Sequence, residues 1–330
     1  MNHNQNQMDD FQKNIIEFNK QLTEKNLRTS NLHKLSGIRP DGLIIIGMGG
    51  SGLAGEVLRA VKKEIGLNLP VTNWKDYGLP EHSFKKPLYI FASFSGNTEE
   101  TLSGLKNIFG GGKKSLVAAV SSGGELGKLA DNKHIPFVSF SPGSLTPRQS
   151  VGTMFYGLTK ILKAAGLKPR IKNYSGKIKP EKFRREGQKI AALLKDRMVL
   201  VYTDENHRHL GYIWKIKLNE TAKNPAFNNV LPEMNHNEIV GFENKKIKTA
   251  AIFLKSASRP RIEKRFKLTE KLLKEKGVRV ISLNLSGKNE LEKTWRTIPL
   301  ADWATYYLAK LNGQSPVETK SIDKLKELMG

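Results

Sequence analysis

The chain has 330 residues, of which 38% are hydrophobic, and it carries a formal net charge of +24 at pH 7. This length allows two domains with sizeable cores, whereas the absence of cysteine excludes disulfides, thiolate metal sites and cysteine nucleophiles. No apolar run is long enough to span a membrane, and residues 1–20 lack the apolar core of a secretory signal, so we expect a cytoplasmic protein without a membrane partner.

The first half of the chain alternates strand and helix patterns. After a helix over residues 8–21, strands are predicted at 42–47, 69–74, 88–93, 115–121 and 136–139, with helices at 53–63, after residue 98 and at 125–132. Such alternation is typical of a doubly wound parallel sheet with helices on its faces. A helix over 151–165 follows, so the sequence predicts a first domain at residues 1–165.

The pattern restarts after a polar, Lys-rich stretch, residues 166–180, which we interpret as a linker. Strands are predicted at 198–203, 248–254 and 279–285, and helices at 181–194, 209–221, 259–276 and 291–311. The repeated order of elements predicts a second domain of the same kind at residues 181–330. Its last segment, 316–330, forms an amphipathic turn or helix, and we expect its apolar residues Ile322, Leu325 and Leu328 to dock on another surface.

Two strand-to-helix turns in the first half predict an anion site. Residues 47–52 read Gly-Met-Gly-Gly-Ser-Gly after one apolar strand, and residues 93–98 read Ser-Phe-Ser-Gly-Asn-Thr after another. Each turn places backbone N–H groups and short hydroxyls at a helix N-terminus, where an anion is stabilised. The hydroxyls of Ser93, Ser95 and Thr98 suit the three acceptor oxygens of a phosphate monoester.

The first turn alone does not identify the ligand. It matches Gly-x-Gly-x-x-Gly, but about twenty residues later no acidic residue closes a strand to hold a ribose, and no Gly-Lys-Ser/Thr ending makes it a nucleotide P-loop. Either turn by itself is also compatible with an ordinary connection that uses Gly for positive φ and Ser or Thr as a cap. The second turn resembles the Ser-x-Ser-Gly-x-Thr loop of the sugar isomerase (SIS) fold, which implies a sugar-phosphate ligand.

The second half contains two reactive candidates. Glu220 lies at the end of a predicted helix, within Asn-Glu-Thr-Ala-Lys at 219–223, and His236 follows within Pro-Glu-Met-Asn-His-Asn-Glu at 232–238. A carboxylate and an imidazole brought to one cleft can divide proton transfers between carbon and oxygen. Spacing alone also leaves both residues open to ordinary roles, as a salt-bridge partner and as a loop or core histidine.

Four separated motifs, in the family's order, resemble the bifunctional phosphoglucose/phosphomannose isomerases. They are the serine loop at 93–98, Pro-Arg at 147–148 ahead of a helix, Asn-Glu-x-x-Lys at 219–223, and Pro-Glu-x-Asn-His-Asn-Glu-x-x-Gly at 232–241. The resemblance spans nearly the whole chain. It implies an α/β protein of two doubly wound, parallel-sheet SIS domains. It also implies an isomerase that interconverts glucose 6-phosphate and mannose 6-phosphate with fructose 6-phosphate through an enediolate.

The resemblance implies which residues bind the substrate. The sugar phosphate would be gripped by the hydroxyls of the serine loop, namely Ser93, Ser95 and Thr98. The pocket would be lined by three residues of the first turn, namely Gly49, Gly50 and Ser51. In the tail, Thr319 would stand where single-substrate relatives have a bulkier glutamine, and it would leave room for either C2 epimer.

The resemblance also implies four catalytic residues. Glu220 would move the proton between C1 and C2, and Arg148 would stabilise the charge of the enediolate. His236 would reach in from the neighbouring subunit of a homodimer with shared active sites to open the sugar ring, and Lys326 would assist it. These groups supply a base, a fixed cation and an acid at the ring oxygen. No metal or organic cofactor is expected, because the substrate's own carbonyl acts as the electron sink.

Three further positions bear on the expected site. Thr221 directly follows the proposed base, where relatives commonly have Asn; this departure from the family pattern concerns the fine orientation of Glu220 and not its identity as the base. His207 and His209 form a His-x-His pair, but no third ligand lies at a diagnostic spacing, and we expect a loop-to-helix connection there instead of a metal site. Glu238 is compatible with holding His236 or with facing solvent.

Two other functions stay open at this point. One is another SIS-type sugar-phosphate isomerase or lyase, against which the Glu220 and His236 motifs argue. The other is a non-catalytic, sugar-phosphate-sensing protein that uses its positive charge on nucleic acid and has no need for Glu220. The Lys and Arg residues are dispersed, without a helix-turn-helix, aromatic RNA-binding signature or zinc-finger spacing, so we do not expect a nucleic acid partner.

Overall fold

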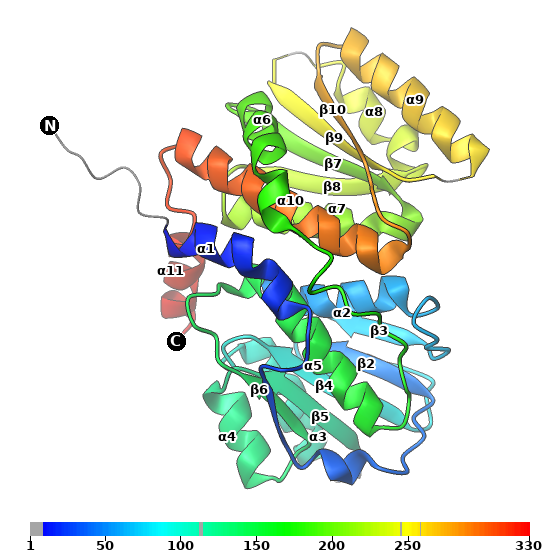
Figure 1. The fold of residues 1–330 in the computed structure, drawn as a ribbon, viewed down its shortest axis with the longest axis vertical. Coiled ribbons are helices and arrows are strands. Elements are labelled where there is room, and N and C mark those ends of the chain that lie inside the picture. Colours follow the sequence, from blue (N-terminus) through cyan, green and yellow to red (C-terminus); the bar gives the residue numbers. More distant parts are fainter. Residues whose placement is uncertain (1–8, 112–114, 245, 258) are drawn as a thin grey trace, which may run out of the picture. The chain divides into compact units, whose positions relative to one another are not determined.

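The computed structural model describes residues 9–111, 115–244, 246–257 and 259–330. They form two compact units (Figure 1). The N-terminal unit comprises Glu17–Ile178 and Asn289–Leu291. The C-terminal unit comprises Lys179–Lys288 and Glu292–Gly330, together with the described residues up to Ile16. No helix in the described part of the chain is both long enough and apolar enough to cross a membrane.

The N-terminal unit contains a six-stranded sheet in the order β1-β6-β5-β4-β2-β3. Its strands are β1 (Leu27–Ser30), β2 (Gly42–Ile46), β3 (Val71–Trp74), β4 (Pro87–Ser93), β5 (Leu116–Ser121) and β6 (Phe137–Phe140). β1 is antiparallel to β6, and the other neighbouring strands are parallel. The chain leaves β2 and β4 in opposite directions, so the strand order reverses between these two strands.

Helices cover both faces of this sheet (Figure 1). α3 (Glu99–Gly110) and α4 (Gly124–Asn132) bury Leu105 and Leu126 in one hydrophobic cluster that also contains Ile44 and Ile46 of β2. α2 (Gly49–Val61) and α5 (Val151–Ala164) pack against each other, and α2 approaches the alternate residue Ile45. Successive side chains of a strand point to opposite faces, so β2 is buried on both sides and reads as a continuous apolar run.

The C-terminal unit contains a four-stranded parallel sheet in the order β10-β9-β7-β8. Its strands are β7 (Met198–Asp204), β8 (Ala226–Leu231), β9 (Thr249–Lys255) and β10 (Arg279–Asn284). Its helices are α1 (Asp10–Ile16), α6 (Arg184–Leu194), α7 (Arg208–Glu220), α8 (Glu238–Gly241), α9 (Pro260–Glu275), α10 (Glu290–Leu311) and α11 (Lys320–Met329). α7 and α9 leave the point where the strand order reverses in opposite directions, so right-handed crossovers place them on opposite faces.

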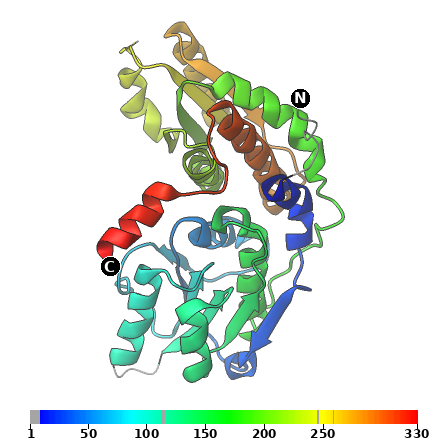
Figure 2. The same ribbon diagram turned by 90° about the vertical axis from the view of Figure 1, so that its left-hand side faces the viewer.

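The structure confirms the predicted fold class, since both sheets are parallel-rich and doubly wound. The predicted helix over residues 8–21 is α1 followed by a 3-10 segment, η1 (Glu17–Gln21), and residue 8 lies outside the described residues. The predicted tail helix is α11, the last helix in Figure 2. Its residues Ile322, Leu325 and Leu328 are 42%, 58% and 73% exposed, so their docking stays a prediction.

Candidate active site

The two predicted anion-binding turns lie side by side in the N-terminal unit. They follow β2 and β4, which pair directly, with Ile46 opposite Phe91. The hydroxyl of Ser51, in the first turn of α2, accepts a hydrogen bond of 2.8 Å from the backbone N–H of Phe94. The structure therefore brings Ser51 and the serine loop together at the point where the strand order of the sheet reverses.

Hydroxyl groups hold the serine loop in shape. The oxygens Oγ of Ser93 and Oγ1 of Thr98 are 2.8 Å apart, and Ser93 Oγ also accepts the backbone N–H of Gly96 at 3.0 Å. Ser95 accepts the N–H of Asn97 at 3.2 Å, and its side chain is exposed. These short bonds fix the three hydroxyls of the predicted phosphate grip within one turn.

A third turn, after β5, supports the serine loop and was missed by the sequence analysis. Gly96 has φ of +77°, and a Cβ added there would lie 1.8 Å from the carbonyl oxygen of Gly123. Asn97 Oδ1 accepts the N–H of Glu125 at 2.9 Å, and the hydroxyl of Ser122 donates to the carbonyl of Phe94 at 2.7 Å. The signal was available, because Ser-Ser-Gly-Gly at 121–124 is a further Ser- and Gly-rich turn after a predicted strand.

The start of α2 packs against the short 3-10 segment η3 (Pro147–Gln149). A Cβ added at Gly50 would lie 2.7 Å from the backbone nitrogen of Arg148, so this approach requires glycine. Arg148 is 1% exposed. The structure thus places Gly49, Gly50 and Ser51 in one neighbourhood with the predicted catalytic arginine.

The sequence analysis also missed Lys75. It follows β3, and its Cε lies 3.6 Å from the Cβ that a side chain at Gly52 would carry. Its Nζ is 2.6 Å from the buried Glu56 of α2, which also binds Arg59 at 2.8 Å. Burial raises the pKa of Glu56, but the hydrogen bond and charge of Lys75, and then those of Arg59, outweigh this and hold the pKa below its ordinary value. A cation is therefore fixed beside the first turn of α2.

In the C-terminal unit, Glu220 is the last residue of α7, and its neighbours fix the position of this helix end. The side chain of Asn219 donates to the carbonyl of Ala226 at 2.9 Å and accepts the N–H of Ala226 at 3.2 Å. Lys223, in the left-handed region with φ of 51°, donates to the carbonyl of Glu220 at 2.9 Å and to that of Ser315. The Asn and Lys of the Asn-Glu-x-x-Lys motif thus attach the helix end to β8 and to the chain after α10.

Glu220 and Thr319 line the same cavity, which has a volume of about 460 Å³. Lys223, Glu318 and Lys320 also contribute to it. Thr319 directly precedes α11, and its carbonyl accepts the N–H groups of Ile322 and Asp323. Lys326 lies on α11 two helical turns after Thr319, about 10 Å along the axis, and does not belong to the described lining of this cavity.

His236 lies far from Glu220 within the chain. It ends the 3-10 segment η6 (Glu233–His236), beyond the carboxyl end of β8, and is exposed. Glu220 lies at the other end of this strand, because Asn219 binds its first residue, Ala226. A strand of six residues spans about 17 Å. The structure therefore does not bring the predicted base and the predicted histidine together in one chain.

The side chain of Glu238 binds residues of the sheet and does not hold His236. Its carboxylate accepts hydrogen bonds from the Tyr202 hydroxyl at 2.9 Å and from the Asn229 amide at 2.5 Å. Burial, and then the charge of Glu238, raises the pKa of Tyr202 well above its ordinary value. Tyr202 therefore stays a neutral donor, and Glu238 ties α8 to β7 and β8.

The His-x-His pair forms separate contacts. His207 Nδ1 lies 2.6 Å from Asp204 Oδ1, and His209 Nε2 lies 3.0 Å from the hydroxyl of Thr294. Among the residues that the structure describes, no group of three or more His, Asp or Glu side chains could hold a metal ion. His207 lies in the connection between β7 and α7, and His209 lies in the first turn of α7.

Some known proteins resemble this chain in sequence, and others resemble it in fold. The family model of the bacterial phospho-glucose isomerase C-terminal SIS domain matches residues 183–329. A bifunctional phosphoglucose/phosphomannose isomerase from Aquifex aeolicus is 32% identical over 292 residues, which cover 87% of this chain and 89% of that protein. A D-glucosamine-6-phosphate 4-epimerase from Sulfolobus acidocaldarius is 33% identical over 198 residues, covering 58% and 61%.

Among solved structures, a hypothetical protein from Thermus thermophilus superimposes with a TM-score of 0.68, covering 96% of this chain and 89% of that one at 17% identity. At 17% identity, this superposition shows that the two proteins share a fold and no more. The match to the Aquifex aeolicus protein, at 32% identity over most of both sequences, shows the family. The protein is thus a sugar-phosphate isomerase of the SIS type, and the chain belongs to the bifunctional phosphoglucose/phosphomannose isomerase family.

Proposed function

We propose that the protein interconverts glucose 6-phosphate and mannose 6-phosphate with fructose 6-phosphate. The observation that carries this proposal is the cavity shared by Glu220 and Thr319, in a chain that is similar over most of its length to relatives named for both activities. This cavity supports the proposal because Glu220 supplies a base and Thr319 supplies a small side chain beside it.

The proposed base is Glu220. On an open-chain aldose, its carboxylate takes the proton from C2, and the electron pair forms the enediolate with the former aldehyde carbon. Return of this proton to C1, together with transfer of the hydroxyl proton from O2 to O1, gives the ketose, so the step is balanced without an added reagent. Asn219 binds the first residue of β8, and Lys223 binds the carbonyls of Glu220 and Ser315. These hydrogen bonds support the role of Glu220, because they hold the helix end that carries its carboxylate.

The proposed phosphate grip is the serine loop with the first turn of α2. Gly49, Gly50 and Ser51 form a helix start whose first turn carries no acidic residue, which favours an anion. The bonds among Ser93, Gly96 and Thr98 support a preformed loop. Binding of the distant phosphate holds the reacting carbons in place and contributes to the rate.

The remaining roles are charge stabilisation and ring opening. We assign the enediolate charge to Arg148 and ring opening to His236, assisted by Lys326. Because His236 lies at the opposite end of β8 from Glu220, we propose that it serves the site of a second copy in a homodimer. Thr319, beside the base, leaves room for the C2 hydroxyl of either epimer.

The Sulfolobus acidocaldarius relative favours a second candidate function. It is named a D-glucosamine-6-phosphate 4-epimerase and is 33% identical over 198 residues. Epimerisation at C4 changes a different carbon of a similar hexose phosphate, so the two functions predict different products from the same kind of substrate.

A coupled assay tests both. With glucose 6-phosphate or mannose 6-phosphate, we expect fructose 6-phosphate at comparable rates, and with glucosamine 6-phosphate no change at C4. Formation of the C4 epimer without any fructose 6-phosphate would replace the proposed function by the second candidate.

A further inference from the structure

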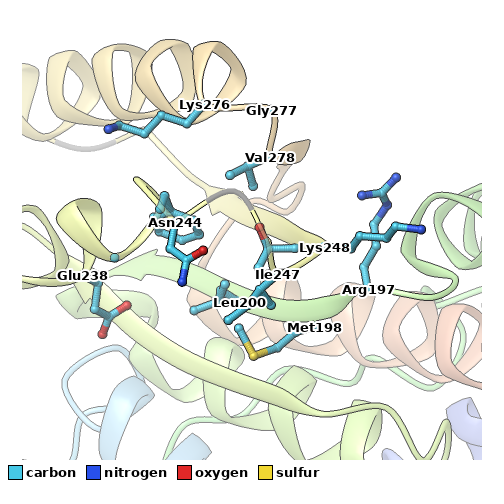
Figure 3. A pocket seen from close by; sticks show the side chains of 13 residues that line it. Arg197, Met198, Leu200, Glu238, Asn244, Ile247, Lys248, Lys276, Gly277 and Val278 are labelled. Carbon is cyan, nitrogen blue, oxygen red and sulfur yellow. The ribbon is translucent and has the colours of Figure 1, made fainter.

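A second cavity of the C-terminal unit lies away from the candidate base. It has a volume of about 340 Å³ and is formed by the starts of β7 and β9, by α8 with the loop after it, and by the end of α9 (Figure 3). Within the described residues it shares no lining residue with the cavity of Glu220. α8 and α9 cover the face of the sheet opposite α7, so the two cavities belong to different faces.

The floor of this cavity is apolar and continuous with the core of the unit. Leu200, Phe242 and Val278 line it and pack within one hydrophobic cluster. Met198 and Ile247 extend this surface towards the opening, and Ile247 is 54% exposed. Figure 3 shows Met198, Leu200, Ile247 and Val278 facing the same space. An open apolar surface of this kind favours an apolar group, because its burial releases water.

The opening is positively charged. Arg197 precedes β7, Lys248 precedes β9 and Lys276 follows α9, so three separate elements supply its cations. Arg197 and Lys248 extend from the same side of the cavity in Figure 3. Lys276 is 3.3 Å from Glu243, a carboxylate 66% exposed, and such exposed pairs contribute little.

The only carboxylate that lines the described cavity is Glu238, and both of its oxygens accept hydrogen bonds. Tyr202 and Asn229 donate to them from the sheet. These bonds disperse the negative charge of Glu238, which lies across the cavity from Arg197 and Lys248 in Figure 3. A ligand that fits this cavity therefore needs an apolar part for the floor and a negative charge for the cations.

We propose that this cavity binds a small organic anion, with its apolar body on the floor and its phosphate or carboxylate between Arg197 and Lys248. The volume is at the small end of ligand sites, which range from about 300 to 1,000 Å³. A nucleoside monophosphate and a medium-chain carboxylate share this chemistry. A hexose phosphate does not, because its body would place several hydroxyls on an apolar floor without partners.

The test is a titration of the full chain, labelled at Met, Leu and Ile methyl groups and followed by NMR. The probes are adenosine monophosphate and octanoate, with adenosine and octanol as their uncharged counterparts. We expect one of the two anions to shift the Met198, Leu200 and Ile247 signals saturably, with a Kd below about 1 mM and at least about tenfold tighter than its counterpart. Which anion binds identifies the source of the ligand.

Two variants complete the test. Arg197→Gln combined with Lys248→Gln should weaken binding of the anion at least about tenfold and leave the uncharged counterpart unaffected. The control is Lys271→Gln, which removes an exposed cation from the outer side of α9 and should change nothing. No saturable shift with either anion, equal binding of the uncharged counterparts, or an equal effect of Lys271→Gln would overturn the proposal.

Discussion

The two units share one architecture, but the candidate phosphate-binding turns of the N-terminal unit and the candidate base of the C-terminal unit lie at opposite ends of their strands. In the N-terminal unit the serine loop and the first turn of α2 lie at the carboxyl ends of β4 and β2, where the strand order reverses. In the C-terminal unit the strand order reverses between β7 and β9, yet Glu220 lies beside the amino end of β8.

This difference follows from what each group has to do. A phosphate is bound largely by backbone N–H groups and helix starts, which a parallel sheet supplies at its carboxyl edge. A general base is a single side chain, and it requires only a fixed position within reach of the substrate. The fold therefore predicts the position of the phosphate site. The position of the base depends on local contacts, such as those of Asn219 and Lys223.

The largest expected effect concerns the base. Glu220→Gln keeps the shape of the side chain and removes the proton acceptor, so turnover should fall at least about a hundredfold with KM largely retained. Exchange of the C2 hydrogen with solvent should be lost in parallel. The matched control is Glu318→Gln in the same cavity, which should retain most of the turnover. Substantial turnover in Glu220→Gln would move the base elsewhere.

The serine loop should respond to substitution in a different way. Gly96→Ala forces a Cβ into the left-handed region and to within 1.8 Å of the carbonyl of Gly123, so the loop must shift. We expect KM for glucose 6-phosphate to rise at least about tenfold. Gly127→Ala in α4 is the control, because its Cβ would meet only the Phe137 ring at 3.7 Å. Unchanged KM in Gly96→Ala would separate this loop from phosphate binding.

Thr319 tests the choice between C2 epimers. Thr319→Gln adds bulk to the cavity of Glu220, and it should lower kcat/KM for mannose 6-phosphate about tenfold relative to glucose 6-phosphate. Thr319→Ser, which adds no bulk, should keep both activities. The ratio of the two kcat/KM values is the measurement, and a ratio unaffected by glutamine would mean that another residue sets the epimer preference.

The smallest effect concerns stability and its pH dependence. The pKa of Glu56 is lower in the folded state than its ordinary value of 4.5, so its contribution is fully present above that value and is lost as the pH falls through the folded pKa. Glu56→Gln should reduce the free energy of unfolding by about 2 kcal/mol at pH 7. Chemical denaturation at several pH values should show this difference shrink below pH 4.5. A difference independent of pH would exclude a charged role for Glu56.

Most of the fold could be predicted because apolar runs and helical periodicity are local properties of the sequence. Two strands were not predicted, β1 and β8, and both are edge strands with polar residues in their middle. In β8 the adjacent Asn228 and Asn229 are of a type that strands disfavour, and pairing with β7 overrides this preference. α2 begins at Gly49, before the predicted residue 53, because its close approach to η3 requires glycines that otherwise weaken a helix.

The candidate site could be predicted only as a set of separate motifs. The Ser-x-Ser-Gly-x-Thr pattern could be interpreted from the sequence alone, because its hydroxyls form hydrogen bonds within one turn. That Glu220 and Thr319 share a cavity depends on the contact between Lys223 and Ser315, which are far apart in the sequence. Lys75 was missed for the same reason, because its position beside Gly52 depends on Glu56 of a neighbouring element.

The central claim is that Glu220 and His236, at opposite ends of β8, serve one reaction through two copies of the chain. Mixing Glu220→Gln and His236→Ala subunits, each nearly inactive on a cyclic substrate as a homodimer, tests it directly. Random exchange produces heterodimers with one intact site and one doubly altered site, so activity should recover to about a quarter of the wild-type value. No recovery, with subunit exchange verified by mass, would contradict the claim.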